Sequence, residues 1–147
     1  MKGKRKMKVY IYKEIHWEYS DILDVLSEAA MLREKARLIE EAKKKRYEEI
    51  FQRELEISKL KEQRRALCIK DQNENVPIQQ ALKASGDKAA VKAFRKQRKV
   101  ILKEIERLGS QIWRLEWENE KLQKYDDDKL IDRFFPELAF YEYDVLD

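Results

Sequence analysis

Apolar residues recur along most of the chain in alternating steps of three and four, the spacing of one face of an α-helix. A first series runs from Ile22 to Leu67 and a second from Val91 to Leu122. Sustained over about seven and about five heptads, this pattern is typical of coiled coils. We therefore expect one helix over residues 20–69 and another over 88–125, packed together as an antiparallel coiled-coil hairpin of the all-α class.

The stretch between the two series, residues 70–87, is predicted to be a connector that contains a short helix. It opens with a polar run from Asp71 to Asn75, which interrupts the heptad pattern. Pro77 suits the first turn of a short helix, and Gly86 suits its end because glycine tolerates left-handed backbone. Asp87 is then placed to cap the second long helix, as Ser20 or Asp21 is placed to cap the first.

Both ends of the chain change to a period of two, which is the spacing of one face of a β-strand. Residues 7–17 alternate in this way, and so do residues 138–145. Because a hairpin returns the chain to its start, the two segments can form a small strand pair, helped by opposite charges. We expect a single elongated domain over 1–147, with a basic arm and strand at 1–19 and an acidic aromatic segment at 126–147.

Composition supports a helical, water-soluble protein. Charged residues make up 42% of the chain and hydrophobic residues 43%, with only three glycines and two prolines, as in helix-rich proteins. The single cysteine, Cys68, forms no intramolecular disulfide and fits a reducing compartment. No apolar run reaches the ~20 residues that span a bilayer. We expect a cytoplasmic protein with no membrane association.

Charge is distributed unevenly along the sequence. Residues 57–103 hold thirteen Lys and Arg against four acids, whereas residues 104–147 hold six against thirteen acids. In a hairpin, this distribution predicts a basic tip and an acidic base, and such a separation of charge guides the choice of partner.

Six polar residues interrupt the apolar seam. We interpret them as side chains that reach out to solvent or set the helix register, rather than as ligands for a phosphate or an acidic partner. They are Lys43, Arg46, Arg53, Arg64, Arg98 and Asn119.

Four aromatic residues extend the apolar surface beyond what a two-helix contact requires: Tyr47, Phe51, Trp113 and Trp117. They can pack inside the hairpin or against the terminal strands, or they can meet a second copy or another protein. Trp and Tyr are common interface anchors, and a two-helix protein buries little surface by itself. We expect a homodimer that uses these four residues as its partner-binding site.

A one-sided basic cluster is the candidate nucleic-acid site. It comprises Lys88, Lys92, Arg95, Lys96, Lys99 and Lys103, with Arg64 and Arg65 expected across the hairpin near the same tip. A solvated charged face explains the cluster equally well. No base-reading motif accompanies it, so binding to DNA or RNA is expected to depend on charge and shape.

The sequence indicates no catalytic, cofactor or metal site, and we expect neither an enzyme nor a small-molecule binder. The run from Asp71 resembles the opening of an EF-hand loop, but Val76 and Leu82 stand where that loop requires glycine and glutamate. Asp126 to Asp128 are explained by helix capping. His16 is the single histidine, and no second His or Cys supports a metal site there. Cys68 has no histidine nearby in sequence to make it a nucleophile.

Three functional hypotheses follow. The first is a non-catalytic coiled-coil assembly protein that self-associates and binds a macromolecular partner through the basic tip or the acidic aromatic base. The alternative is a charge-driven DNA- or RNA-binding protein. The third is a small inhibitor or regulator of a nucleic-acid enzyme, of the kind that mobile elements encode, whose acidic tail competes with phosphates.

Overall fold

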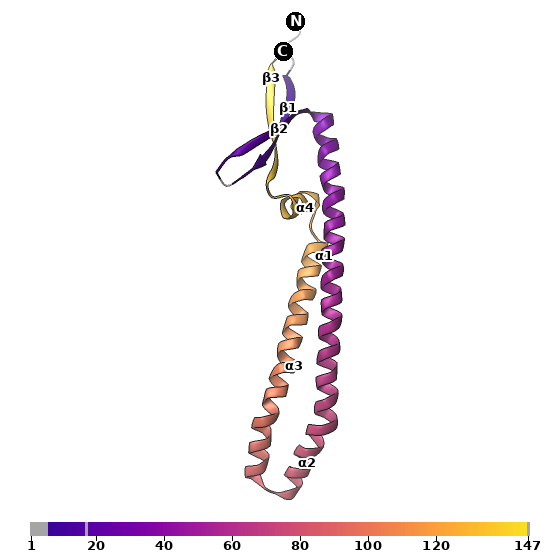
Figure 1. Cartoon of the computed structure of the whole chain (residues 1–147), viewed down its shortest axis with the longest axis vertical. Coiled ribbons are helices and arrows are strands. Elements are labelled where there is room, and N and C mark those ends of the chain that lie inside the picture. Colours follow the sequence, from indigo (N-terminus) through magenta and orange to yellow (C-terminus); the bar gives the residue numbers. More distant parts are fainter. Residues whose placement is uncertain (1–5, 17, 147) are drawn as a thin grey trace. The chain divides into compact units, whose positions relative to one another are not determined.

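The computed structural model describes residues 6–16 and 18–146. It is mostly helical and contains a small three-stranded antiparallel sheet (Figure 1). In chain order the elements are β1 (Lys6–Ile15), β2 (Ser20–Ser27), α1 (Glu28–Lys70), a π-helical turn (Asp71–Asn75), α2 (Val76–Ser85), α3 (Lys88–Gln123), α4 (Asp127–Phe134) and β3 (Leu138–Leu146). The described residues form two compact units: the sheet unit (residues up to 48 and from 124) and the helix-pair unit (Glu49–Gln123).

The predicted strand pair is a sheet of three strands, in the order β2-β1-β3. The two terminal segments do pair, since β1 and β3 are antiparallel from Lys6 to Glu14 of β1, with Val9 opposite Tyr143. The Lys8 ammonium lies 2.9 Å from the Glu142 carboxylate, an opposite-charge contact between these two strands. The additional strand, β2, pairs with the other edge of β1.

The prediction that the first helix begins at residue 20 is wrong, because residues 20–27 form β2. The His16 N–H donates to the Tyr19 carbonyl at 2.7 Å, which turns the chain back so that Val25 pairs with Ile11. The apolar residues Ile22 and Val25 fitted the heptad series, but a strand accommodates them equally. Helix α1 starts eight residues later, at Glu28, where the Ser27 hydroxyl accepts from the Ala30 N–H at 3.2 Å.

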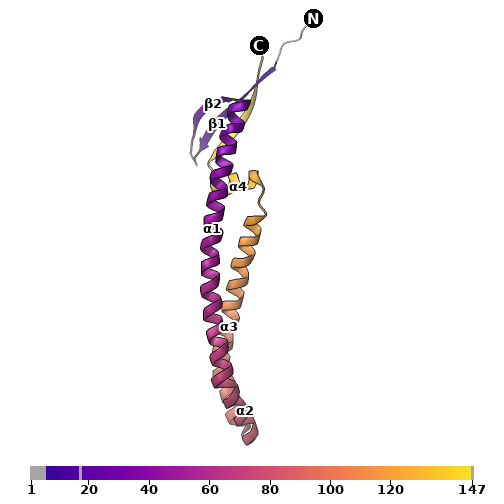
Figure 2. The same cartoon turned by 90° about the vertical axis from the view of Figure 1, so that its right-hand side faces the viewer.

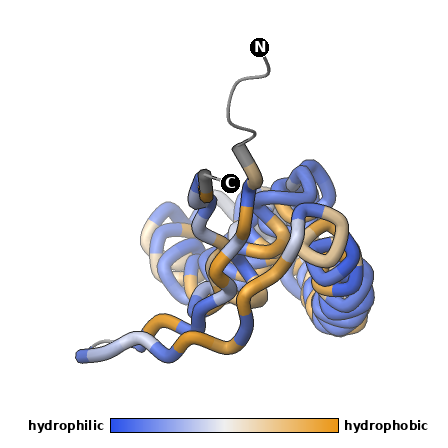
Figure 3. The backbone as a smooth tube through the Cα atoms, turned by 90° about the horizontal axis from the view of Figure 1, so that it is seen from above, coloured by the Kyte–Doolittle hydropathy of each residue, from blue (hydrophilic) through white to orange (hydrophobic). Residues whose placement is uncertain are grey.

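The core of the sheet unit combines residues from distant parts of the sequence. Tyr12 of β1 and Ile131 of α4 pack with Leu38 of α1. The Tyr12 and Phe140 rings stack with their centroids 4.6 Å apart. Hydrophobic and hydrophilic residues alternate along the strands in Figure 3, as the period of two predicted. Trp17, which was expected to continue the alternation, lies outside the described residues.

In the helix-pair unit, α3 runs alongside the later part of α1 in the opposite direction (Figures 1 and 2). The main apolar cluster joins the two helices, and its buried members are Ile57, Leu60, Leu108, Ile112 and Leu115. The predicted second helix, 88–125, matches α3 to within two residues at its C-terminal end. The Asp87 carboxylate accepts from the Ala90 N–H at 3.1 Å, so Asp87 caps α3 as expected.

The connector differs from the prediction at its polar run. Residues 71–75 do not interrupt the helix but continue it as one π-helical turn. Asn75 does not cap α2 with its side chain, which instead donates to Asp71 at 3.0 Å. The predicted short helix is present as α2, and Gly86 ends it with a φ of 75°, a left-handed conformation that favours glycine.

Candidate functional site

Both tryptophans of α3 are exposed. Trp113 and Trp117, one helical turn apart, expose 66% and 49% of their surface. Phe51 of α1 is also exposed. Lys61 of α1 and Glu116 of α3 form an ion pair of 3.0 Å at the junction of the two helices. At 100° per residue, Phe51 lies about 80° around α1 from Lys61, and Trp113 and Trp117 lie about 60° and 100° around α3 from Glu116, so all three point outward from the helix pair. We call these three residues the tryptophan face.

Tyr47, the fourth predicted anchor, is exposed on α1 one helical turn before Phe51. It belongs to the sheet unit, whereas the tryptophan face belongs to the helix-pair unit. All four predicted partner-binding residues are therefore exposed.

A groove of about 500 Å³ adjoins the tryptophan face. Its lining includes Trp113, Gly109 and Arg64. A Cβ atom placed on Gly109 would lie only 3.3 Å from Nε of Arg64, so glycine gives the Arg64 side chain room to pass over α3. This close approach accounts for a glycine in the middle of a long helix, where it costs about 1 kcal/mol relative to alanine.

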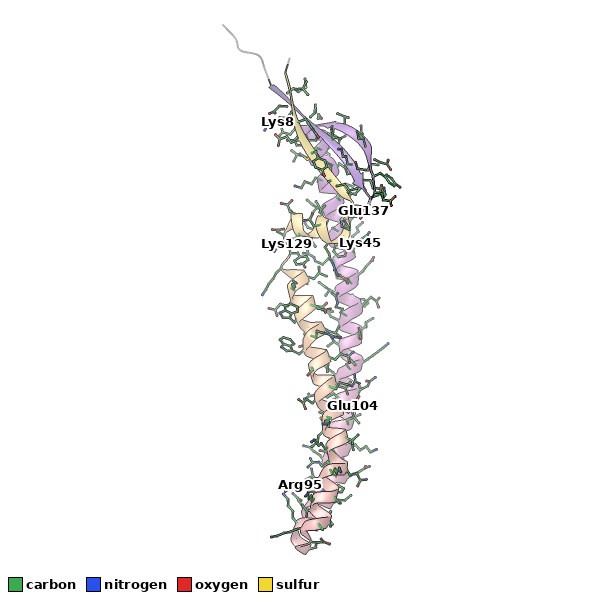
Figure 4. All side chains as sticks on the ribbon, turned by 90° about the vertical axis from the view of Figure 1, so that its left-hand side faces the viewer. Lys8, Lys45, Arg95, Glu104, Lys129 and Glu137 are labelled. Carbon is green, nitrogen blue, oxygen red and sulfur yellow. The ribbon has the colours of Figure 1, made fainter. Side chains whose placement is uncertain are left out.

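The basic cluster of α3 lies on one side of that helix, and we call it the basic face: Lys88, Lys92, Arg95, Lys96, Lys99 and Lys103. All six are exposed, and none is in an ion pair with another residue of the described chain. Arg95 is visible near the α2 end of α3 in Figure 4. From Lys92 to Trp117, steps of four and three follow one stripe, which is basic in its first half and carries the tryptophans in its second.

Arg64 of α1 lies just beyond the end of the basic face. It lies beside Gly109, Glu106 and Trp113. Gly109 is six residues beyond Lys103, the last residue of the basic face, which corresponds to about 9 Å along α3. Arg65 is exposed on α1.

A buried polar cluster holds the connector against α3. The Arg98 guanidinium donates to both carboxylate oxygens of Asp71, at 2.8 and 2.7 Å, and to Oε1 of Gln79 at 2.9 Å. Asp71 is only 5% exposed. The guanidinium holds the pKa of the Asp71 carboxyl below its usual value. Arg98 thus has an internal partner, and only 20% of its side chain is exposed.

Asn119 is also buried in the seam of the helix-pair unit. Its amide donates to the Ile50 carbonyl at 3.4 Å, and its side-chain oxygen accepts from Arg53 at 3.5 Å. These contacts join α3 to α1 at one particular level, as expected of a residue that sets register. Arg53 is further paired with Glu49 and Glu118.

Sequence reasoning missed an apolar surface on the sheet. Residues directly opposite each other in the register share a face, and the side away from Tyr12 carries Met7, Val9, Ile11, Val25, Tyr141, Tyr143 and Val145. We call this set the sheet face. Five of the seven are exposed, and the other two are partly so. The alternation at 138–145 was the available signal, but the period of two does not say which side is covered.

The remaining candidates show no metal-binding or membrane-spanning arrangement. Within residues 6–16 and 18–146, nowhere do three His, Cys, Asp or Glu side chains gather as they would around a metal ion. The Asp126 carboxylate caps α4 by accepting from the Lys129 N–H at 2.9 Å. Nε2 of His16 lies 3.0 Å from Oε1 of Glu14, near the end of β1. None of the described helices has an apolar stretch long enough to cross a membrane.

The comparisons with known proteins add no functional assignment to these surfaces. The chain matches no protein-family model, and no curated protein and no solved structure is significantly similar to it.

Proposed function

We propose that this chain is a non-catalytic interaction protein that self-associates through the tryptophan face and binds a macromolecular partner elsewhere. The observation that carries the proposal is the exposure of Trp113 and Trp117, one turn apart on a well-formed helix. Single exposed apolar residues are ordinary, but two neighbouring tryptophans leave a large apolar area in contact with water.

Self-association is favoured because the helix-pair unit has little core of its own. Its apolar cluster is a single seam between two helices, which we propose packs as an antiparallel coiled-coil hairpin. A second copy placed against the tryptophan face would give a four-helix arrangement, in which apolar side chains of more helices surround a shared core. A two-fold symmetric contact brings the same patch from each copy together. The stripe beside the tryptophans carries both Lys103 and Glu106, so Lys103 of one copy can meet Glu106 of the other across the contact.

The sheet face is the surface we assign to the macromolecular partner. It belongs to the acidic aromatic segment through Tyr141, Tyr143 and Val145. Lys13 of β1, whose ammonium lies 5.0 Å from the centre of the Tyr141 ring, is the charged residue beside it. An apolar face with charge at its margin is typical of a protein-binding surface rather than of a catalytic site.

The test is the solution mass of the full chain, measured by size-exclusion chromatography with light scattering. We expect the wild type to be a dimer at about 50 µM, a concentration well above the Kd of ordinary stable dimers. Trp113→Ala with Trp117→Ala is expected to give a monomer with unchanged helical circular dichroism. Val100→Ala is the matched control, because Val100 is an exposed apolar residue of α3 that lies off the tryptophan stripe.

Two results would contradict the assignment. A wild-type monomer at that concentration would exclude self-association of this kind. A dimer that survives the double tryptophan change, but dissociates after Tyr141→Ser with Tyr143→Ser, would place the self-contact on the sheet face instead.

A further inference from the structure

The basic face has an excess of charge that the rest of the described chain does not neutralise. Three cations near it in the helix-pair unit are paired: Lys61 with Glu116, Arg107 with Glu104, and Arg98 with Asp71. Between residues 86 and 103 the only acid is Asp87, and its carboxylate accepts the Ala90 N–H as the cap of α3. Six like charges on one side of a helix repel one another, and an anionic partner would relieve that repulsion.

Part of this charge lines a cleft. Lys83 of α2 and Lys88, Lys92 and Arg95 of α3 stand around a cleft of about 600 Å³ at the turn formed by Gly86. The volume is in the range of ordinary ligand sites. Cations from two different helices can therefore approach one bound phosphate from two sides.

The two walls of the cleft are held in place by the buried polar cluster. Arg98 of α3 bonds both to Asp71 in the π-helical turn and to Gln79 of α2. The cations need not be assembled when a ligand arrives, because α2 is already fixed against α3. Such preorganisation lowers the entropic cost of binding.

The shape of the basic face favours a polymer over a single small anion. Lys88, Lys92, Arg95, Lys99 and Lys103 follow one another in steps of four, three, four and four. From first to last they cover about 22 Å of helix. A nucleic-acid duplex carries one charge per about 1.7 Å of its axis, counted over both strands, so it presents several phosphates over this length, whereas one small anion reaches only one or two of these side chains.

We propose that the basic face and the α2–α3 cleft together form a binding site for the phosphate backbone of a nucleic acid. Recognition is by charge and not by base sequence, because lysines predominate and the side chains suited to reading bases, such as exposed Asn or aromatic residues, are not part of the face. Apart from Lys103, the site uses none of the residues assigned to self-association, so either assignment can hold without the other.

The experiment measures binding of the full-length chain to a fluorescein-labelled 20-base-pair DNA duplex of mixed sequence, by anisotropy, at several salt concentrations. If five cations each neutralise one phosphate, the logarithm of the affinity should fall with the logarithm of salt with a slope of about −4.5. The triple variant K88Q/K92Q/R95Q should lose at least about tenfold in affinity at 0.1 M salt, and its slope should be shallower by about 2.7.

The matched control is R33Q/K44Q/K59Q, which removes the same charge from exposed positions of α1 that are in no ion pair among the described residues. Its affinity should stay within about twofold of the wild-type affinity, and its salt slope should differ from the wild-type slope by less than about one. Equal losses in the two triple variants would overturn the proposal, since they would show attraction to net charge alone. No wild-type binding at ~50 mM salt, where phosphate contacts are strongest, would also overturn it.

A third arm separates a polymer from a small anion. Inorganic phosphate, added at constant ionic strength, should not displace the duplex at 10 mM. Displacement at that concentration, together with phosphate binding that K88Q/K92Q/R95Q abolishes, would identify a small-anion site in the cleft and would reject a nucleic-acid ligand.

Discussion

In the sheet unit, Leu38 and Leu130 are each only 1% exposed, whereas four of the five members of the helix-pair cluster are 7–9% exposed and only Leu108 is lower. The sheet unit receives its core residues from a sheet, from α1 and from α4, so a central side chain is covered from several directions. Two cylinders side by side touch only along a line, so most side chains of a two-helix core are covered from fewer directions.

The polar residues differ accordingly. The helix-pair unit has the buried Asn119 and the Asp71–Arg98 pair inside its seam. These polar contacts fix the register of the two helices, which hydrophobic burial alone would not fix because it is non-directional. The sheet unit obtains its register from the hydrogen-bonded ladder between β1 and its two neighbours. The two units thus differ in what fixes their contacts: the helix-pair unit relies on specific polar contacts in its seam, and the sheet unit relies on backbone hydrogen bonds between strands.

The largest predicted effect comes from a substitution in the core of the sheet unit. Leu38→Ala should lower the free energy of unfolding by about 3 kcal/mol, because a fully buried leucine leaves a cavity. Leu32→Ala on the same helix, where the side chain is 54% exposed, should cost less than about 1 kcal/mol. Urea denaturation followed by circular dichroism measures both. Equal costs would mean that Leu38 is not in the core.

The second prediction concerns the buried pair of the helix-pair unit. Asp71→Asn should destabilise by about 2 kcal/mol at pH 7, below the 3–5 kcal/mol of a fully buried pair, because Arg98 retains some access to solvent. Asp132→Asn, an exposed aspartate of α4, is the control and should change stability by less than about 0.5 kcal/mol. Urea unfolding of the three proteins gives the comparison.

The same pair predicts a pH dependence. Arg98 lowers the pKa of Asp71 in the folded protein, while an unfolded aspartate titrates near about 3.9. A lowered folded pKa stabilises the native state fully above the unfolded value, and this stabilisation is lost as the pH falls through the folded pKa. The stability difference between wild type and Asp71→Asn should therefore be constant from neutral pH to about pH 5 and shrink below about pH 4. A difference that grows on acidification would contradict the ion pair.

The smallest predicted effect tests whether Asn119 sets the register. Asn119→Leu should raise the free energy of unfolding by about 1 kcal/mol, since a polar seam residue gives specificity at a cost in stability. It should also broaden the distribution of masses in light scattering. Leu122→Met, a conservative change at the next seam position, should leave a single species. A less stable Asn119→Leu with one species would show that its hydrogen bonds are needed for stability instead.

Local sequence signals located several features without help from the fold. The heptad steps from Val91 to Leu122 found α3, because a helix satisfies its backbone within its own segment and its apolar face is visible in the spacing. Gly86 and Asp87 marked the turn before it because turn and cap chemistry are local. The pairing of the two terminal segments was also predicted, from the return of the chain and the opposite charges.

Three features needed the tertiary structure. Ile22 and Val25 fit a helix and a strand equally, and only the free edge of β1 decided for β2. The positions of α1 and α4 decide which side of the sheet is covered. The period of two in the sequence shows that the strands have two different faces, but it does not show which face is exposed. The polar run at Asp71 became helical because Arg98, 27 positions away, supplied a partner inside the fold. In each case the conformation depends on contacts with residues distant in the chain, and the energy of such contacts cannot be read from the local sequence pattern.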